Sequence, residues 1–220
     1  MKICIIPARS GSRRIPHKNR KYFHGKPIIA YSIEAAKESG LFGNAIFVST
    51  DDDEISKIAM NYGALSFHRS VELSQDSVGT QAVARAFLLE RIHKMEQEKV
   101  CWAKPGEKIH HVCTLYATAP MVSPEDLQRG FSFLEHTKLQ MVYSAKAVYD
   151  SLYSKAYAED AGQWYFGTTA AVLAEVVPRD GNPGVSSFFI PSERVCDINV
   201  EADWSMAERM YAEMVSKRNA

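Results

Sequence analysis

The sequence predicts an α/β protein in which helices cover both faces of a mostly parallel sheet. Short apolar runs typical of buried strands alternate along the chain with longer segments whose apolar residues recur at helical spacing. The 220 residues, of which 46% are apolar, are enough to build one sizeable core. We therefore expect a single three-layer α/β/α domain over residues 1–220, with right-handed crossovers between the parallel strands.

The predicted strands are marked by apolar and β-branched runs. The first run, residues 2–7, is apolar without alternation, as in strands that are covered on both faces. The runs predict strands at 2–7, 45–49, 64–67, 111–115 and 141–147, and shorter extended pieces at 187–190 and 195–198. No internal repeat interrupts this order.

The predicted helices lie between these strands and carry terminal signals. Pro27 and Pro124 stand at first helical positions, while Gly40 and Gly63 provide left-handed stops. The acidic run Asp51–Asp53 suits the capped start of a helix. The expected helices cover 27–39, 51–62, 80–97, a segment from 124, and a last segment from 201 that buries Trp204, Ala207, Tyr211 and Met214.

Positive charge is concentrated at the N-terminal end of a neutral chain. Lys plus Arg and Asp plus Glu both number 26, so no global field favours nucleic acid or a membrane surface. Residues 1–33 nevertheless hold eight of the Lys and Arg residues and no acidic residue, and several lie in the stretch IIPARSGSRRIPHKN at 5–19. Cations among small residues at the end of a buried strand suit a polyphosphate. The loop matches neither the dinucleotide nor the P-loop glycine motif, and a nucleic-acid-binding patch is the alternative interpretation.

The four cysteines and the N-terminus indicate the cellular compartment in which the protein is expected. Cys4, Cys101, Cys113 and Cys196 have neither C-x-x-C nor zinc-ligand spacing, which predicts reduced thiols. No signal peptide and no run of membrane-spanning length is present. We expect a soluble cytoplasmic protein without a membrane or nucleic-acid partner.

Ordered motifs along nearly the whole chain resemble the cytidylyltransferases that activate sialic-acid-type sugars. The basic loop is similar to the signature loop of that family, and the later motifs are most similar to its pseudaminic acid branch. The matching segments are 6–9 (IPAR), 11–16 (GSRRIP), 18–19 (KN), 48–55 (VSTDDDEI), Arg69 with 72–73 (EL) and Asp76, 116–120 (YATAP), 160–165 (DAGQWY) and 197–204 (DINVEADW).

The resemblance implies a fold and a reaction. The fold is that of the nucleotide-diphospho-sugar transferases. The anomeric hydroxyl of a nine-carbon α-keto acid sugar attacks the α-phosphate of CTP, giving a CMP-sugar and pyrophosphate, with Mg²⁺ as cofactor. Such enzymes are commonly homodimers, and a small dimerisation or sugar-lid element is expected around 141–170.

The resemblance also implies roles for individual residues. Lys18, Arg9 and Asp197 are expected to be catalytic, and Arg13 stands where the family usually has lysine. The expected nucleotide-binding residues are Ala8, Arg9, Ser10, Arg13, Lys18, Asn19, Arg69 and Thr80; the sugar-binding residues are Tyr116, Thr118, Asp160 and Gln163; the metal-binding residues are Asp197 and Asn199. Structural roles stay open for some of them, because Asn19 and Asp160 also suit turns, Thr80 a helix cap and Tyr116 a core position.

The sequence departs from the family pattern in two places. Asn199 replaces a second aspartate, which predicts weaker magnesium binding or an altered metal preference. Only ten residues separate Tyr149 from Asp160, where relatives carry a longer segment, so sugar choice and dimer mode are open. The alternatives are a synthetase for sialic, legionaminic or Kdo acid, and a CTP-binding homologue with reduced or lost turnover.

Overall fold

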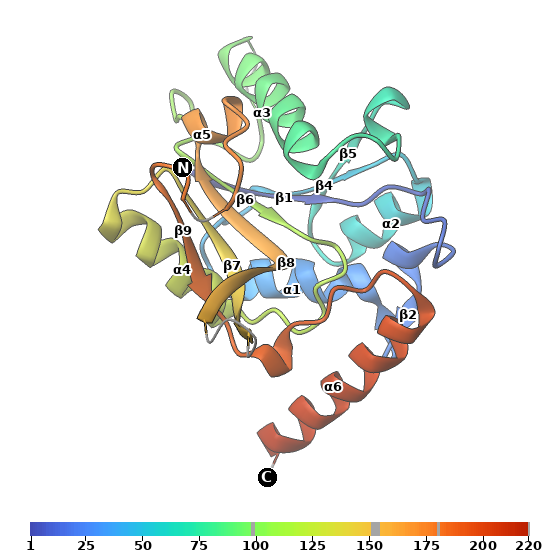
Figure 1. Ribbon diagram of the computed structural model, residues 1–220. Helices are drawn as coiled ribbons and strands as arrows, with labels where there is room; N and C mark the ends of the chain where they lie inside the picture. The colour runs from blue at the N-terminus through green and yellow to red at the C-terminus, as the bar shows by residue number, and fades with distance from the viewer. Residues whose placement is uncertain (98–99, 151–154, 180, 220) are drawn as a thin grey trace.

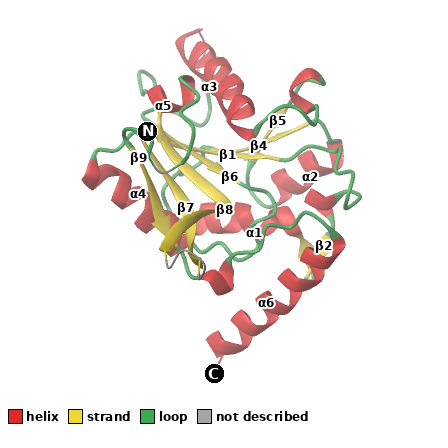
Figure 2. Cartoon of the chain, in the orientation of Figure 1, coloured by secondary structure: helices red, strands yellow, loops and turns green. Residues whose placement is uncertain are grey.

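A seven-stranded sheet forms the centre of the structure, a computed structural model that describes residues 1–97, 100–150, 155–179 and 181–219. Helices cover both faces of this sheet (Figures 1 and 2). The strands are β1 (Lys2–Pro7), β4 (Ile46–Thr50), β5 (Leu65–His68), β6 (His111–Leu115), β7 (Met141–Asp150), β8 (Lys155–Thr168) and β9 (Val185–Phe189), with a separate hairpin of β2 (Tyr22–Phe23) and β3 (Lys26–Pro27). The helices are α1 (Ile28–Glu38), α2 (Asp53–Asn61), α3 (Thr80–Gln97), α4 (Pro124–Thr137), α5 (Thr169–Leu173) and α6 (Glu201–Asn219).

The strand order confirms a mostly parallel sheet. The order is β5-β4-β1-β6-β8-β7-β9, and β1 pairs in parallel with β4 and β6 at its centre. Strand β8 is antiparallel to both of its neighbours, β6 and β7, whereas β9 runs parallel to β7. The carboxyl ends of β1, β4, β5 and β6 therefore meet at one edge.

Alternating side chains of the strands build a core on each face of the sheet. On one face Cys4 and Ile6 of β1 share a buried cluster with Ile33 of α1 and with residues of α2 and α4. On the other face Ile3 belongs to a cluster with Phe87 of α3. Because residues on both faces are removed from water, β1 has the uninterrupted apolar composition seen in the sequence. These two clusters confirm the three-layer α/β/α prediction.

The helices and strands predicted from the sequence agree closely with those of the structure in the first two thirds of the chain and less well beyond. Helix α3 and strand β6 have the predicted bounds. Strand β8 and helix α5 were not predicted, and β7 extends three residues further than expected, so the predicted element around 141–170 contains a long antiparallel pair. At the predicted extended piece 195–198, Val195 has extended backbone angles, but the segment pairs with no strand of the described chain. The shortened segment between Tyr149 and Asp160 includes residues 151–154, which lie outside the described residues.

The last helix anchors the C-terminal segment beside the basic loop. Trp204 and Ala207 of α6 are buried with Ile15 of the loop and Ile198. The ammonium of Lys21 lies 4.4 Å from the Trp204 ring centroid, which adds a cation–π contact. Beyond these contacts α6 extends away from the sheet (Figure 1), and the expected burial of Tyr211 and Met214 is only partial. The packing of α6 brings residues 197–199 to the loop.

The thiols agree with the sequence expectation. All four cysteines are free. Cys4 and Cys113 are buried opposite each other on β1 and β6, and Cys101 is exposed. Within the described ranges, no helix has both the length and the apolar composition needed to cross a bilayer.

Candidate functional site

A cleft of about 560 Å³ opens at the carboxyl ends of β1, β5 and β6. This is the edge at which open α/β sheets bind their ligands. Its lining includes the basic loop, the segment after β5 and the start of the segment after β6. The lining residues are Pro7, Arg9, Ser12, Arg13, Arg14, Ile15, Lys18, Asn19, Arg69, Asp76, Val78, Thr80, Val83, Tyr116, Ala117, Thr118 and Asn199.

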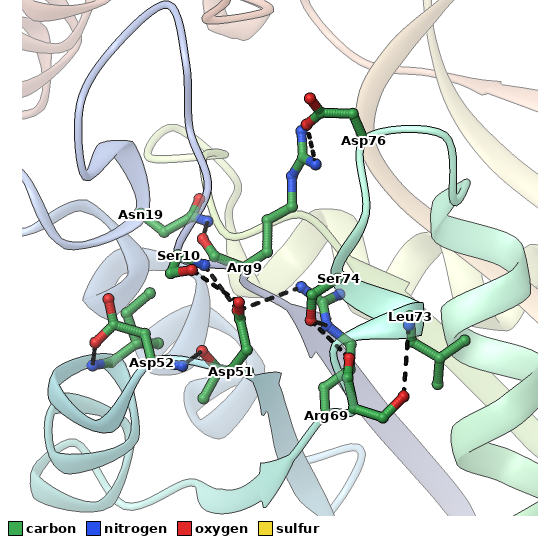
Figure 3. A network of polar contacts seen from close by, with 12 residues as sticks. Arg9, Ser10, Asn19, Asp51, Asp52, Arg69, Leu73, Ser74 and Asp76 are labelled. Carbon is green, nitrogen blue, oxygen red and sulfur yellow. Dashed lines mark hydrogen bonds and ion pairs between the residues drawn. The ribbon is translucent and has the colours of Figure 1, made fainter.

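The basic loop is folded back on itself by its own polar contacts. Nδ2 of Asn19 donates a hydrogen bond to the carbonyl oxygen of Arg9 at 2.9 Å, which closes the loop at its base (Figure 3). Between them, His17 takes the left-handed conformation at φ 55° and starts the short 3₁₀ turn Lys18–Arg20. Arg9 and Lys18 consequently lie on the same cleft although they are nine positions apart in the sequence.

Lys18 is the most constrained cation of the loop. Its Nζ donates to the carbonyl oxygen of Ile198 at 2.6 Å, so it ties the loop to the segment before α6. Burial lowers the pKa of Lys18, and the carboxylate of Asp197 offsets part of that effect. The nearby charges of Arg14 and Arg9 lower this pKa further. Cations held this close together favour an anion between them.

Another part of the cleft lining is built around Arg69, which is only 4% exposed. Its Nε donates to Oγ of Ser74 at 3.2 Å, whereas its Nη2 is buried and has no hydrogen-bond partner among the described residues. Thr80 donates from Oγ1 to the hydroxyl of Tyr116 at 3.4 Å. The guanidinium of Arg69 therefore places a buried positive charge beneath this part of the cleft.

A line of polar side chains continues from Tyr116 toward β8. The rings of Tyr116 and Tyr165 lie 5.5 Å apart, and the Tyr165 hydroxyl donates to Oδ2 of Asp160 at 2.8 Å. Oδ1 of Asp160 accepts from the backbone N–H of Gly162, whose φ of +59° forms a turn that favours glycine. Burial raises the pKa of the Asp160 carboxyl, and Asp197 adds to this rise.

The structure brings together most, but not all, of the predicted site residues. Those that line the cleft are Arg9, Arg13, Lys18, Asn19, Arg69, Thr80, Tyr116, Thr118 and Asn199. Those outside the lining are Ala8, Ser10, Asp160, Gln163 and Asp197. Gln163 is buried, and its Nε2 donates to the carbonyl oxygen of Arg194 at 2.6 Å, whereas its Oε1 has no hydrogen-bond partner among the described residues.

The predicted metal residues lie side by side next to the cations. Nδ2 of Asn199 donates to Oδ2 of Asp197 at 2.6 Å, and Oδ1 of Asn199 accepts from Arg14 at 3.0 Å. Glu201, two residues further on, lies on the first turn of α6 and pairs with Lys21 at 2.8 Å. The described residues contain no group of three or more His, Cys, Asp or Glu side chains suited to a metal. Asp197 and Asn199 are therefore the adjacent pair of side chains here, and the carboxylate of Asp203 lies close by, where it accepts from the backbone N–H of Asn199 at 2.8 Å.

Two cleft residues were missed as site residues by the sequence reasoning. Asp76 forms ion pairs with Arg9 and with Nε of Arg13, the latter at 2.6 Å. Arg14 binds Asn199 from across the cleft. Asp76 belongs to one of the recognised motifs, but its partners lie more than sixty positions away and depend on the tertiary fold.

A second hollow, of about 820 Å³, is larger than the cleft but is a poorer candidate. It lies between the end of α3 and residues 100–109, at the amino end of β6. Its lining is largely apolar, with Ile92, Met95 and Ile109 among the residues. The cation cluster and the carboxyl ends of the parallel strands are both at the first cleft, which we assign as the functional site.

The comparisons with known proteins point to one family. The sequence model of the Cytidylyltransferase family matches residues 3–160. Two curated relatives, both named pseudaminic acid cytidylyltransferase and both from Campylobacter jejuni subsp. jejuni, are 36% identical over 237 residues (serotype O:23/36) and 34% identical over 236 residues (serotype O:2). Each alignment covers 95% of this chain and 95% of the relative.

A solved structure supports the fold at low sequence identity. The structure of CMP:2-keto-3-deoxy-manno-octonic acid synthetase complexed with CTP superposes with a TM-score of 0.69 at 14% identity, covering 97% of this chain and 99% of that one. This likeness concerns the fold. The family is shown by the match over residues 3–160 and by the two full-length relatives. The protein belongs to the cytidylyltransferase family.

Proposed function

We propose that the protein is a cytoplasmic cytidylyltransferase that activates a nonulosonic acid, pseudaminic acid in the first instance, with CTP. The observation that carries the proposal is the cleft itself, which is lined by four cations of one loop and by the buried Arg69. Full-length similarity to pseudaminic acid cytidylyltransferases supports the choice of sugar. The free thiols of the chain support the compartment.

The proposed reaction is a displacement at the α-phosphate of CTP. The anomeric hydroxyl oxygen of the sugar acid forms a bond to that phosphorus and loses its proton to solvent, while the bond from phosphorus to the oxygen that bridges to the β-phosphate breaks and pyrophosphate leaves. Such a reaction depends mainly on positioning and on neutralising charge. Arg9 and Lys18 are proposed to hold the phosphates, with Arg13 and Arg14 adding charge at the open side of the cleft.

The two ends of the cleft are proposed to hold the two halves of the product. Arg69 and Thr80 lie where the cytidine would bind, with Ala8, Ser10 and Asn19 shaping the loop beneath it. Tyr116 and Thr118 lie where the sugar would begin, and Asp160 and Gln163 support that end from behind the lining. The polar line from Thr80 through Tyr116 toward Asp160 connects both ends.

Magnesium is proposed as the cofactor. The donors present fit this ion, with one carboxylate fewer than the family pattern has. Mg²⁺ usually takes one or two protein carboxylates together with substrate phosphates and water. Asp197 supplies one carboxylate, and Asn199 has an amide oxygen that now accepts from Arg14. When bound, the ion would neutralise charge on the phosphates.

Replacing Asn199 with aspartate is expected to strengthen magnesium binding. The Asn199→Asp change restores a second carboxylate beside Asp197, and affinity for hard cations rises with the number of charged ligands. We expect the magnesium concentration at half-saturation to fall by about tenfold. Calorimetric titration of magnesium into the CTP complex measures this change, and turnover against magnesium gives a second readout. An unchanged magnesium dependence in both measurements would show that Asn199 is not a metal-binding position.

Replacing Asp76 with asparagine is expected to tighten CTP binding. Asp76 pairs with Arg9 and Arg13, which the phosphates of CTP would otherwise engage. Removing this competing charge should lower the Kd by about threefold to fivefold, because exposed ion pairs are individually weak. Calorimetry with Asp76→Asn measures the effect, and Glu125→Gln, an exposed charge on the first turn of α4, is the control. Weaker binding in Asp76→Asn would mean that the carboxylate supports the nucleotide instead of competing with it.

A homodimer is also proposed, with the β7–β8 pair at its interface. Near the ends of these strands Tyr149 and Tyr157 are 66% and 51% exposed, and the register places them on opposite faces of the pair. Exposed aromatic side chains are common where another chain packs. Light scattering should give the mass of a dimer for the wild type and a shift toward monomer for Tyr149→Ser with Tyr157→Ser. A monomeric wild type at micromolar concentration would exclude this arrangement.

The proposed function is tested by pyrophosphate release from CTP and magnesium with a panel of sugar acids. Pseudaminic, sialic, legionaminic and Kdo acids are supplied separately, and we expect the highest kcat/KM with pseudaminic acid. Binding of CTP without pyrophosphate from any sugar would favour a homologue that has lost turnover. Salt-sensitive nucleic-acid binding that CTP does not displace would instead favour the basic-patch interpretation.

A further inference from the structure

Asp51 is a largely buried carboxylate behind the cleft to which no role has so far been given. It follows β4 directly, and its side chain is 19% exposed. The sequence suggested that it helps to cap α2, but Asp52 does this by accepting from the N–H groups of Glu54 and Ile55. Asp51 is therefore free to bind elsewhere.

The side chain of Asp51 bonds to the basic loop at the residue after Arg9. Its Oδ1 accepts from the backbone N–H of Ser10 at 2.8 Å, and its Oδ2 accepts from the Ser10 hydroxyl at 2.7 Å (Figure 3). The two bonds use both carboxylate oxygens and fix the backbone and the side chain of one loop residue. Arg9 is held next to this anchor, and its carbonyl is held by Asn19. Asp51 thus fixes the start of the cation loop to the end of a different strand.

The same carboxylate is the charge partner of Arg69. Nη2 of Arg69 lies 3.9 Å from Oδ1 of Asp51, within ion-pair range but beyond hydrogen-bond length. A guanidinium that is 4% exposed needs an opposite charge nearby, because an unpaired buried charge is costly. Asp51 satisfies this need through its charge, without a hydrogen bond to Nη2 of Arg69.

The presence of a negative charge here is notable because the cleft is proposed to bind a triphosphate. On charge alone, a carboxylate behind an anion site weakens anion binding. Burial by itself would raise the pKa of Asp51, but the hydrogen bonds from Ser10 and the charge of Arg69 outweigh burial and hold that pKa below its ordinary value. The group is therefore ionised at neutral pH, and its repulsion must be offset by the geometry that it imposes.

We propose that Asp51 is a positioning residue that fixes the cation loop, through Ser10, and the guanidinium of Arg69 in one rigid arrangement, so that both ends of the nucleotide bind together. The proposal rests on the proposed CTP-binding function and adds a specific residue to it. The proposal predicts the direction of the change in CTP affinity. Loss of the negative charge alone would tighten CTP binding, whereas loss of the positioning would weaken it.

The test is the Kd of CTP and of CMP, measured by calorimetry, for a set of variants. We expect Asp51→Ala to weaken CTP binding by at least about tenfold and Asp51→Asn by about fivefold, although both remove a negative charge. Ser10→Ala should weaken CTP by about threefold, with a smaller effect on CMP because CMP lacks the outer phosphates. The double variant with Ser10→Ala and Asp51→Ala should bind CTP no more weakly than Asp51→Ala alone.

The matched control is Asp53→Asn. Asp53 belongs to the same acidic run, lies exposed on the first turn of α2 and carries the same charge. Its loss should leave the Kd of CTP within about twofold of wild type. Thermal melting of every variant verifies folding, and a loss of folded protein would lower CTP and CMP binding by the same factor, unlike the change expected for Ser10→Ala.

The outcomes separate this proposal from the proposed function. A wild type that does not bind CTP overturns both. If the wild type binds CTP but Asp51→Asn binds it equally or more tightly, the positioning role of Asp51 is wrong and the function stands. If the Asp51 variants do not fold, Ser10→Ala decides: wild-type CTP affinity in that variant overturns the proposal.

Discussion

Replacing Lys18 with alanine is expected to abolish most CTP binding while the protein remains folded. The Nζ of Lys18 lies among the loop cations and bonds to the carbonyl oxygen of Ile198, so it joins the loop to the segment that carries Asp197 and Asn199. Loss of one charge-assisted contact to phosphate costs about 2 to 3 kcal/mol, or roughly 30- to 150-fold in Kd. Turnover should fall further, because the proposed transition state carries more charge at the phosphates.

Calorimetry with CTP and thermal melting together test the Lys18→Ala variant. Lys57→Ala is the matched control, because Lys57 is an exposed cation on α2, away from the cleft lining. We expect the control to bind CTP as the wild type does. Wild-type CTP affinity in a folded Lys18→Ala protein would show that the basic loop is not the phosphate site.

Replacing Arg194 with alanine is expected to cause a large loss of stability. Arg194 forms a two-pronged ion pair with Asp126 on the first turn of α4, and one of its bonds is 3.0 Å long. Asp126 is 4% exposed, so the change leaves a buried carboxylate without its partner. Breaking such a pair from one side costs about 3 kcal/mol of unfolding free energy.

Chemical denaturation measures this loss, and a second substitution identifies its cause. Arg209→Ala removes an exposed arginine on α6 and should change the unfolding free energy by less than about 0.5 kcal/mol. Adding Asp126→Asn to Arg194→Ala should restore part of the lost stability, because the unpaired charge is gone. No recovery would mean that packing of the Arg194 side chain, and not the ion pair, stabilises this region.

The fold could be predicted where local pattern and tertiary pairing agree. Thr80 and Gln97 bound α3 as predicted: buried residues recur at helical spacing from Val83 to Arg91, and no proline or glycine interrupts the segment. Strand β8 was missed because Lys155–Asp160 lack regular apolar alternation and pair only through the register with β7. Pairing between distant segments, and not local propensity, decides such strands.

The location of the site could be predicted from the sequence more readily than the contacts between its residues. The basic loop at the end of a buried strand and the family resemblance predicted Arg9, Lys18 and Tyr116 as site residues, and the structure places all three on one cleft. Two contacts could not be foreseen, because Asp51 meets Ser10 and Asp76 meets Arg9 only through the alignment of separate strands. The pairing of β1 with β4 sets the first of these contacts.

The central claim, that this protein joins CMP to a nonulosonic acid, is tested most directly by identifying the product. Purified protein is incubated with CTP, magnesium and pseudaminic acid, and the mixture is analysed by mass spectrometry alongside a reaction without the sugar acid. We predict the CMP-sugar and an equal amount of pyrophosphate in the complete reaction and neither in the control. CTP recovered intact with pseudaminic, sialic, legionaminic and Kdo acids alike, from a protein shown to be folded, would contradict the claim.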